Sequence, residues 1–350
     1  MASHRRPKQP SRARVTVLTA TAAAAVALTS QSAQADPKPS KSEVKAKVDK
    51  LYEEAGKATE KFNGAKEQQG KLQKQVDTIQ DRVARGQDGL NELRDSLGSV
   101  ASAQYRSGGM DPSMQLFLSS DPDDYLEQAS ALDQLGAKQS EAIAEIRAKQ
   151  RALAQQREEA QEKLGDLADS RAELGAKKRE VQSKLSAAQK LLNSLTAQER
   201  AELRQEEQQR ADRAADRADL AADKADSADK AGPASGRASS AYSAGQSKIG
   251  KPYVYGASGP DSFDCSGFTS WSFAQAGISI PRTSQAQAAI GTRITSQSDL
   301  KVGDLVFFYS DLHHVGFYAG NGQILHSPRT GAVVRYESID NMPYQFGVRV

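Results

Sequence analysis

The side chains best suited to nucleophilic chemistry are one cysteine and the histidines that follow it. Cys265 is the only cysteine among 350 residues, and three of the four histidines come after it: His313, His314 and His326. A thiol nucleophile needs a base within hydrogen-bond reach, and the base needs a third group that fixes its orientation. We therefore predict Cys265 as the nucleophile, His314 as the base and His326 as the orienting residue.

The residues around Cys265 predict the start of a helix. Asp264 is a favourable N-cap, aromatic residues follow at helical spacing, and Gly277 is a favourable stop. Unpaired backbone N–H groups and the helix dipole stabilise an anion at such a position. We therefore expect the pKa of the thiol to be lowered. The other interpretation of an isolated cysteine is a buried structural residue.

His314 and His326 flank an apparent hairpin whose turn contains Gly320, Asn321 and Gly322. A hairpin centred on Gly320 would pair His314 directly with His326 and place both side chains on one face of the sheet. A tight Asn321-Gly322 turn would instead place them on opposite faces. The sequence leaves both registers open, and the chemistry favours the first. His313 is an extra neighbour that strand alternation points away from His314.

Composition argues against two other kinds of site. The 47 basic and 44 acidic residues give a formal net charge of +3, and this balance, without a local basic patch, gives no reason to expect a nucleic-acid partner. One cysteine and two histidines could bind zinc, but the set lacks a fourth ligand and a Cys-x-x-Cys spacing. We therefore predict no metal and no cofactor.

The first 35 residues have the pattern of an export signal. Arg5, Arg6 and further basic residues precede an apolar run from Val15 to about Thr29, and small residues follow up to Ala35. The run is shorter than the roughly 20 apolar residues that span a bilayer. We expect cleavage after Ala35 and a secreted protein rather than a membrane-anchored one.

Two heptad seams predict a helical domain over residues 36–231. Apolar or small residues recur in steps of four and three between Leu51 and Val100, and again between Leu153 and Leu195. Gly-Gly and Asp-Pro steps separate the two seams, which predicts an antiparallel coiled-coil hairpin. Residues 201–231 repeat Ala, Asp, Arg and Lys, a composition that can form a helix but not a core.

The composition changes again toward the C-terminus. Residues 232–240 are rich in small residues and predict a flexible linker. Residues 241–350 contain more Gly, aromatic and β-branched residues, in short apolar runs that read as strands. Strands that follow the predicted helix at Cys265 indicate an α+β domain.

Five motifs follow one another in this domain, which are Lys251-Pro252-Tyr253-Val254-Tyr255-Gly256, Asp264-Cys265-Ser266-Gly267-Phe268, Pro281-Arg282-Thr283-Ser284, Val302-Gly303-Asp304-Leu305-Val306-Phe307-Phe308 and His314-Val315-Gly316-Phe317-Tyr318, with His326 beyond. In their order and spacing the chain resembles the NlpC-type cell-wall peptidases. This resemblance implies a papain-like fold and a cysteine peptidase that cuts the γ-D-glutamyl to diamino-acid bond of peptidoglycan stems. Such an enzyme would be secreted and associated with the cell wall.

The resemblance also implies roles for individual residues. Cys265, His314 and His326 match the family's nucleophile, base and polar third residue. Tyr253 matches a tyrosine at the active site, which we expect to contact substrate or the oxyanion. Asp264, Ser266 and Arg282 are further candidates for substrate binding. For Asp264 helix capping is the plainer role, and for Arg282 a surface ion pair is the alternative.

The predicted coiled coil is similar to the helical regions of exported actinobacterial NlpC-type hydrolases. That similarity implies two hypotheses: the helices cover the active site, or they dock a membrane-protein regulator. Two other functions for the whole chain are a catalytically silent wall-binding or scaffold protein, and a thiol amidase or acyltransferase that acts on the wall.

Overall fold

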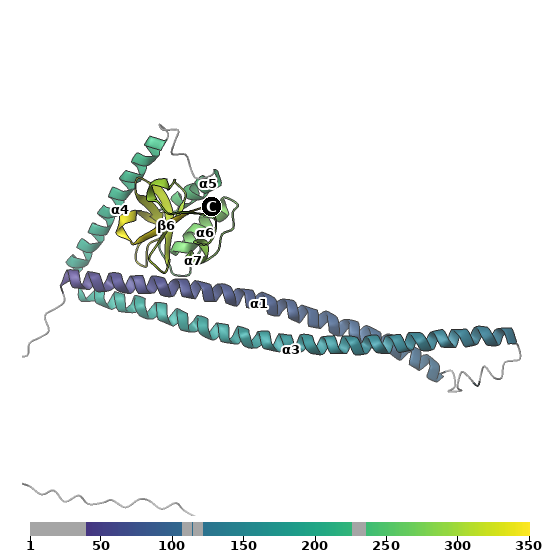
Figure 1. Cartoon of the computed structure of the whole chain (residues 1–350). Coiled ribbons are helices and arrows are strands. Elements are labelled where there is room, and N and C mark those ends of the chain that lie inside the picture. Colours follow the sequence, from purple (N-terminus) through teal and green to yellow (C-terminus); the bar gives the residue numbers. More distant parts are fainter. Residues whose placement is uncertain (1–39, 107–113, 115–121, 226–235) are drawn as a thin grey trace, which may run out of the picture. The chain divides into compact units, whose positions relative to one another are not determined.

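A computed structural model of the chain describes residues 40–106, 114, 122–225 and 236–350 (Figure 1). The predicted export signal and most of the predicted reversal between the two long helices lie outside these residues. Among the residues described, no helix has the length and apolar character needed to cross a membrane.

The two long helices are α1, Lys41–Arg106, and α3, Pro122–Ser194. They run side by side (Figure 1) and bury apolar residues from both helices between them. One such cluster joins Leu72 and Val76 of α1 to Leu167 of α3. The prediction of two paired long helices is confirmed, because the apolar seams are the surfaces that meet.

The C-terminal part of the chain contains one antiparallel six-stranded sheet in the order β1-β6-β2-β3-β4-β5. Its strands are β1 Thr292–Ile294, β2 Leu305–Phe308, β3 His314–Gly320, β4 Gln323–His326, β5 Arg335–Ser338 and β6 Tyr344–Arg349. Two short 3-10 helices, η1 Gln297–Asp299 and η2 Ile339–Asn341, lie between strands in the sequence. Every residue of β2 and β4 is buried.

Three shorter helices accompany the sheet: α5 Gly236–Gln246, α6 Cys265–Gln275 and α7 Ser284–Gln287. Helix α6 packs on β3 through Phe317, whose ring lies 5.8 Å from that of Phe268 and 5.6 Å from that of Phe273, measured between centroids. A helix that begins at a cysteine therefore rests on an antiparallel sheet. This arrangement confirms the α+β, papain-like prediction.

Helix α5 corrects the linker prediction in part. Residues 236–240 are the first turns of α5, and Ala238 is buried. Their small side chains suited a linker, but they lie in the helix whose Gly245 packs close to Phe268, where an added Cβ would lie 3.0 Å from the ring. Residues 232–235 lie outside the part that the structure describes.

Helix α4, Ala197–Ala225, follows α3 after a break. Thr196 and Glu199 form a capping box: the Thr196 N–H donates to the Glu199 carboxylate over 2.8 Å, and the Glu199 N–H donates to the Thr196 hydroxyl over 3.2 Å. Helix α4 then lies against β5, β3 and β4. Ala214 and Ala218 join the main apolar core there, so this alanine repeat contributes to a core that its composition did not predict.

Candidate active site

Cys265 is the first residue of α6, as the sequence predicted. The Asp264 carboxylate caps the helix by accepting a hydrogen bond from the Gly267 N–H over 2.7 Å. At the other end Ala276 is the C-cap, and Gly277 follows with a φ of 74°. The thiol therefore lies at the helix end where backbone N–H groups lack partners within the helix.

The two histidines share one face of the sheet, but they are not directly opposed. Phe317 pairs with Leu325, and a bulge between Tyr318 and Gly320 shifts the register near the turn. The turn is thus as tight as the second predicted register required, and the bulge returns the histidines to the same face. The prediction that His314 faces His326 directly is wrong.

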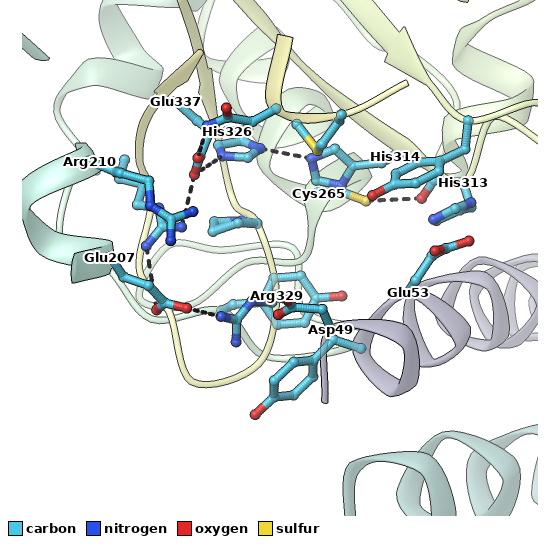
Figure 2. A pocket seen from close by; sticks show the side chains of 18 of the residues that line it. Asp49, Glu53, Glu207, Arg210, Cys265, His313, His314, His326, Arg329 and Glu337 are labelled. Carbon is cyan, nitrogen blue, oxygen red and sulfur yellow. Dashed lines mark hydrogen bonds and ion pairs between the residues drawn. The ribbon is translucent and has the colours of Figure 1, made fainter. Parts of the chain in front are cut away.

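A small residue makes room for this diagonal pair. An added Cβ on Gly316 would lie 2.9 Å from the Cβ of His326. The His314 ring can therefore reach across, and its Nε2 lies 2.8 Å from Nδ1 of His326 (Figure 2). Both histidines are buried, with exposed fractions of 6% and 1%. The structure brings together the base and the orienting residue that the sequence predicted.

His313 points away from this pair, as strand alternation predicted. Its ring stacks on Tyr309 with centroids 4.1 Å apart, and its Nδ1 bonds the Asp311 carboxylate. Its carbonyl oxygen lies 3.7 Å from Sγ of Cys265. The backbone of His313, and not its ring, therefore contacts the thiol.

Asp264 and Arg282 form a bidentate ion pair. The two guanidinium NH groups donate to the two carboxylate oxygens over 3.0 and 2.6 Å, and Asp264 also accepts from the Gly256 N–H over 2.9 Å. Arg282 donates to the Ser266 hydroxyl as well, over 2.8 Å. The polar residues that the sequence grouped as substrate contacts thus bind one another, with Asp264 in the capping role.

A cavity of about 280 Å³ opens beside the thiol. Cys265, His314 and His326 line it from the C-terminal part of the chain (Figure 2). Tyr253 lines it as well. Helices α1 and α4 contribute another part of the wall, including Asp49, Tyr52, Glu53, Glu207 and Arg210. Among the described residues, no cluster of His, Cys, Asp and Glu side chains is arranged to hold a metal ion.

Helix α1 inserts a carboxylate into this site. Glu60 is 3% exposed. Its Oε1 accepts a hydrogen bond from the Ser266 hydroxyl over 2.8 Å and lies 3.7 Å from Sγ of Cys265. Its Oε2 accepts from the Ser284 N–H over 2.8 Å. We call this arrangement the docked state of Glu60.

The neighbours of Glu60 on α1 complete the contact. Asn63, 2% exposed, donates from Nδ2 to Asp264 over 3.0 Å and to Glu60 over 3.2 Å. Phe62 lies edge-on to Tyr255 at 5.8 Å between centroids. The sequence placed Phe62 in the seam between the long helices, whereas the structure packs it on the C-terminal domain.

Burial changes the ionisation of the site. It raises the pKa of the Cys265 thiol well above its ordinary value, and the carboxylates of Glu60 and Asp264 raise it further. The predicted lowering is therefore wrong for the docked state, because desolvation outweighs the helix dipole. Burial and the charge of Asp264 raise the pKa of Glu60 to about 7. Burial also lowers the pKa of His314 to about 3, so its imidazole is neutral near pH 7.

Sequence reasoning missed the α1 contribution. Glu60 and Asn63 lie outside the apolar seam of a highly charged helix, where a polar residue is ordinarily solvated. A weak signal was present: Gly56 and Gly64 are residues that disfavour helix, and they lie in an otherwise highly charged helix. Gly56 lies close to His313, because an added Cβ there would be 3.3 Å from its ring.

Comparisons with known proteins match the C-terminal part of the chain. Residues 250–348 match the model of the NlpC/P60 family. A probable endopeptidase of Corynebacterium glutamicum is 46% identical over 119 residues, which cover 34% of this chain and 56% of that protein. The probable endopeptidase p60 of Listeria innocua is 51% identical over 95 residues, covering 27% of this chain and 20% of that protein.

Among solved structures, the NlpC/p60 domain of the peptidoglycan hydrolase SagA is similar to this chain, with 35% identity and a TM-score of 0.31. The match covers 32% of this chain and 98% of that domain. The two curated relatives are matched over about half or less of their length. The matched residues include Cys265, His314 and His326. The C-terminal domain of this chain belongs to the NlpC/P60 family.

Proposed function

We propose that the chain is a secreted cysteine endopeptidase that cuts peptidoglycan stem peptides. The observation that carries the proposal is a helix-start thiol beside two buried, hydrogen-bonded histidines. The endopeptidase names of the relatives support the reaction class. The γ-D-glutamyl to diamino-acid bond, implied by the family resemblance, is the proposed point of cleavage. Export is inferred from the signal pattern, and association with the wall from the family resemblance.

The proposed reaction is acyl transfer through Cys265. The Cys265 thiol gives its proton to His314, and Sγ attacks the amide carbonyl carbon of the stem. The C–N bond breaks, and His314 returns the proton to the leaving amine. Water then attacks the thioester, which releases a carboxylic acid and restores the thiol. The backbone N–H of Cys265, at the start of α6, would stabilise the oxyanion.

The substrate would use donors that Glu60 now occupies. The Ser266 hydroxyl and the Ser284 N–H both donate to Glu60 in the docked state, so each can donate to a carbonyl or carboxylate oxygen of a stem peptide. Burial raises the pKa of Tyr253 well above its usual range. Its phenol therefore stays protonated and can donate to substrate.

The test is digestion of purified peptidoglycan by the full chain and by Cys265→Ala, followed by mass analysis of the soluble products. We expect products whose masses report hydrolysis between the γ-glutamyl and diamino-acid residues, and none from the variant. A cut at the lactyl amide would indicate an amidase, and transfer to an added amine an acyltransferase. Wall binding without any product from these proteins, and without any from Glu60→Ala, would indicate a scaffold.

We further propose that α1 inhibits the enzyme through Glu60. The Glu60 carboxylate takes the donors Ser266 and Ser284 and lies 3.7 Å from the nucleophilic sulfur. Cys265 is only 4% exposed in this state. A stem peptide and Glu60 cannot occupy the site together, so activity requires α1 to move away.

Contacts elsewhere would hold the docked state. Arg329 bonds Glu207 of α4 and lies over the ring of Tyr52 of α1, 4.4 Å from its centroid. Lys41 of α1 pairs with Glu202 of α4 over 3.0 Å. A partner that displaces α1 must break these contacts. The membrane-protein regulator implied by the family resemblance would act by breaking these contacts.

Glu60→Ala tests the inhibition directly. We expect muropeptide release to rise roughly tenfold to a hundredfold, since hydrogen bonds to charged groups contribute about 1.5–3 kcal/mol each. Glu67→Ala is the matched control, because Glu67 pairs only with Lys71 of its own helix among its described ion pairs. Equal rates for the two variants and the natural sequence would remove the proposal while leaving the peptidase assignment intact.

A further inference from the structure

The second ring nitrogen of His326 is left without a hydrogen bond. Nδ1 of His326 meets His314 over 2.8 Å, whereas Nε2 is buried and has no hydrogen-bond partner in the described structure. The Glu337 carboxylate on β5 lies 3.9 Å from this nitrogen, and its side chain is 11% exposed (Figure 2). A carboxylate therefore lies on the side of His326 that faces away from His314.

The proton of the histidine pair can take two positions. In the first, His326 carries its proton on Nε2, and its Nδ1 accepts a hydrogen bond from the Nε2–H of His314. That leaves Nδ1 of His314 unprotonated and able to accept the proton of the Cys265 thiol. In the second, His326 carries its proton on Nδ1 and donates to His314, whose remaining proton then sits on Nδ1, where it blocks the base. Only the first arrangement is productive.

The charges around His326 decide between these arrangements. Glu337 favours a proton on Nε2, whereas the neighbouring Arg335 disfavours it. Arg335 is the direct strand partner of His326, and its own Nε has no hydrogen-bond partner among the residues that the structure describes. However, the Arg335 guanidinium is engaged by Glu337 over 2.8 Å and by Glu207 of α4 at 4.0 Å. Glu207 also bonds Arg329, so Glu337 is the carboxylate that mainly offsets the charge of Arg335.

We propose that Glu337 is a positioning residue of the active site, which holds the proton on Nε2 of His326 and so keeps Nδ1 of His314 free to act as the base. The separation of 3.9 Å exceeds hydrogen-bond length, so the carboxylate acts as a nearby charge in a poorly solvated site. This inference rests on the proposed function. It adds a fourth member, Glu337, to the set of Cys265, His314 and His326.

Histidine-selective ¹⁵N NMR of the full chain tests the proposal without any substrate. The sequence has four histidines, and ring nitrogen shifts distinguish protonated from unprotonated positions. We expect the proton of His326 on Nε2 and that of His314 on Nε2. The opposite tautomers in the natural sequence would overturn the proposal, and this measurement requires no variant to fold.

Glu337→Gln removes the charge and keeps the side-chain size. We expect the tautomer populations of His326 to shift toward Nδ1–H, and kcat to fall about tenfold to a hundredfold, as is common when an orienting partner of a histidine is lost, with KM unchanged. Asp340→Asn, three residues along on an exposed turn, is the charge-matched control and should match the natural protein.

The two readouts separate the possible failures. Unchanged tautomers and an unchanged kcat in Glu337→Gln would show that Glu337 does not position the pair. Correct tautomers in a protein that releases no muropeptides would instead count against the proposed peptidase activity and leave the positioning intact. A fall in kcat with unshifted tautomers would show a structural role and overturn the proposal.

Discussion

Two stretches of α1 differ in what they bury. The distal stretch, residues 72–91, buries only apolar side chains against α3, which are Leu72, Val76, Ile79 and Leu90. The proximal stretch, residues 44–63, also buries Thr59, Glu60 and Asn63. The distal stretch therefore serves the pairing of two helices, and the proximal stretch combines that pairing with a polar contact to the active site.

The difference shows how a helix can carry structure and regulation at once. An apolar seam tolerates many sequences of similar volume and adds stability without specificity. A buried carboxyl group is costly unless matched donors satisfy it, and Ser266 and Ser284 donate to Glu60 here. The proximal stretch can consequently be released by a change that leaves the distal stretch paired.

The largest effect should come from the thiol that the proximal stretch covers. Cys265→Ala removes the proposed nucleophile, and we expect muropeptide release to fall by at least about 10⁴-fold. The thermal midpoint should change little, because the substituted side chain still fits its buried position. Activity retained at more than a hundredth of the natural rate would show that another group attacks the stem.

A negative charge should raise the activity when it is added to the proximal stretch and leave it unchanged when it is added to the distal stretch. Asn63→Asp would set a second carboxylate against Asp264, where the Asn63 amide now donates over 3.0 Å. We expect release of α1 and a rise in rate of about tenfold, since one tenfold step corresponds to about 1.4 kcal/mol. Asn91→Asp makes the same substitution at an exposed distal position and should leave the rate unchanged. Activation by both substitutions would contradict the claim that only the proximal stretch contacts the active site.

The pH dependence should follow Glu60. Its pKa is about 7 when docked, against an ordinary value of 4.5, so docking favours the protonated acid. Docking is then strongest below about pH 4.5, weakens as the pH rises, and levels off above about 7. Glu60→Gln is neutral at every pH, so the ratio of the natural rate to that of Glu60→Gln should rise severalfold between pH 5.5 and 8. A ratio that does not change with pH would contradict the prediction that Glu60 titrates in this range when it is docked.

The smallest effect on activity should come from the distal seam. Ile79 is 4% exposed, and Ile79→Ala leaves a cavity that should cost about 3 kcal/mol of unfolding free energy. We expect a lower denaturant midpoint for the paired helices and an unchanged rate of muropeptide release. If the rate instead rose as in Glu60→Ala, pairing of α1 with α3 and docking on the site would be one event.

Periodic and local features of the sequence predicted much of this arrangement. The heptad seams indicated the long helices, and the Asp264 cap indicated the position of Cys265, because such signals depend on neighbouring residues alone. The register of the histidine hairpin was left between two alternatives. The structure has the tight turn of one alternative and the shared face of the other, because a bulge between Tyr318 and Gly320 shifts the register. The rules for regular hairpin turns do not include such a bulge.

The remaining features depend on contacts between residues far apart in the chain. Glu60 and Ser266 are 206 positions apart, and nothing near either residue indicates the other. The expected lowering of the thiol pKa failed for the same reason: the helix dipole is local, whereas the burial by α1 is not. Glu337 likewise required the pairing of β4 with β5.

The most direct test of the account is the rate at which iodoacetamide alkylates the thiol of the intact chain. Cys265 is the only cysteine, so mass analysis reports this one site. We predict that Glu60→Ala is alkylated at least about tenfold faster than the natural sequence, since one buried charged contact accounts for that factor, with Glu67→Ala unchanged. Equal alkylation rates for all three proteins would contradict the claim that Glu60 covers a reactive thiol.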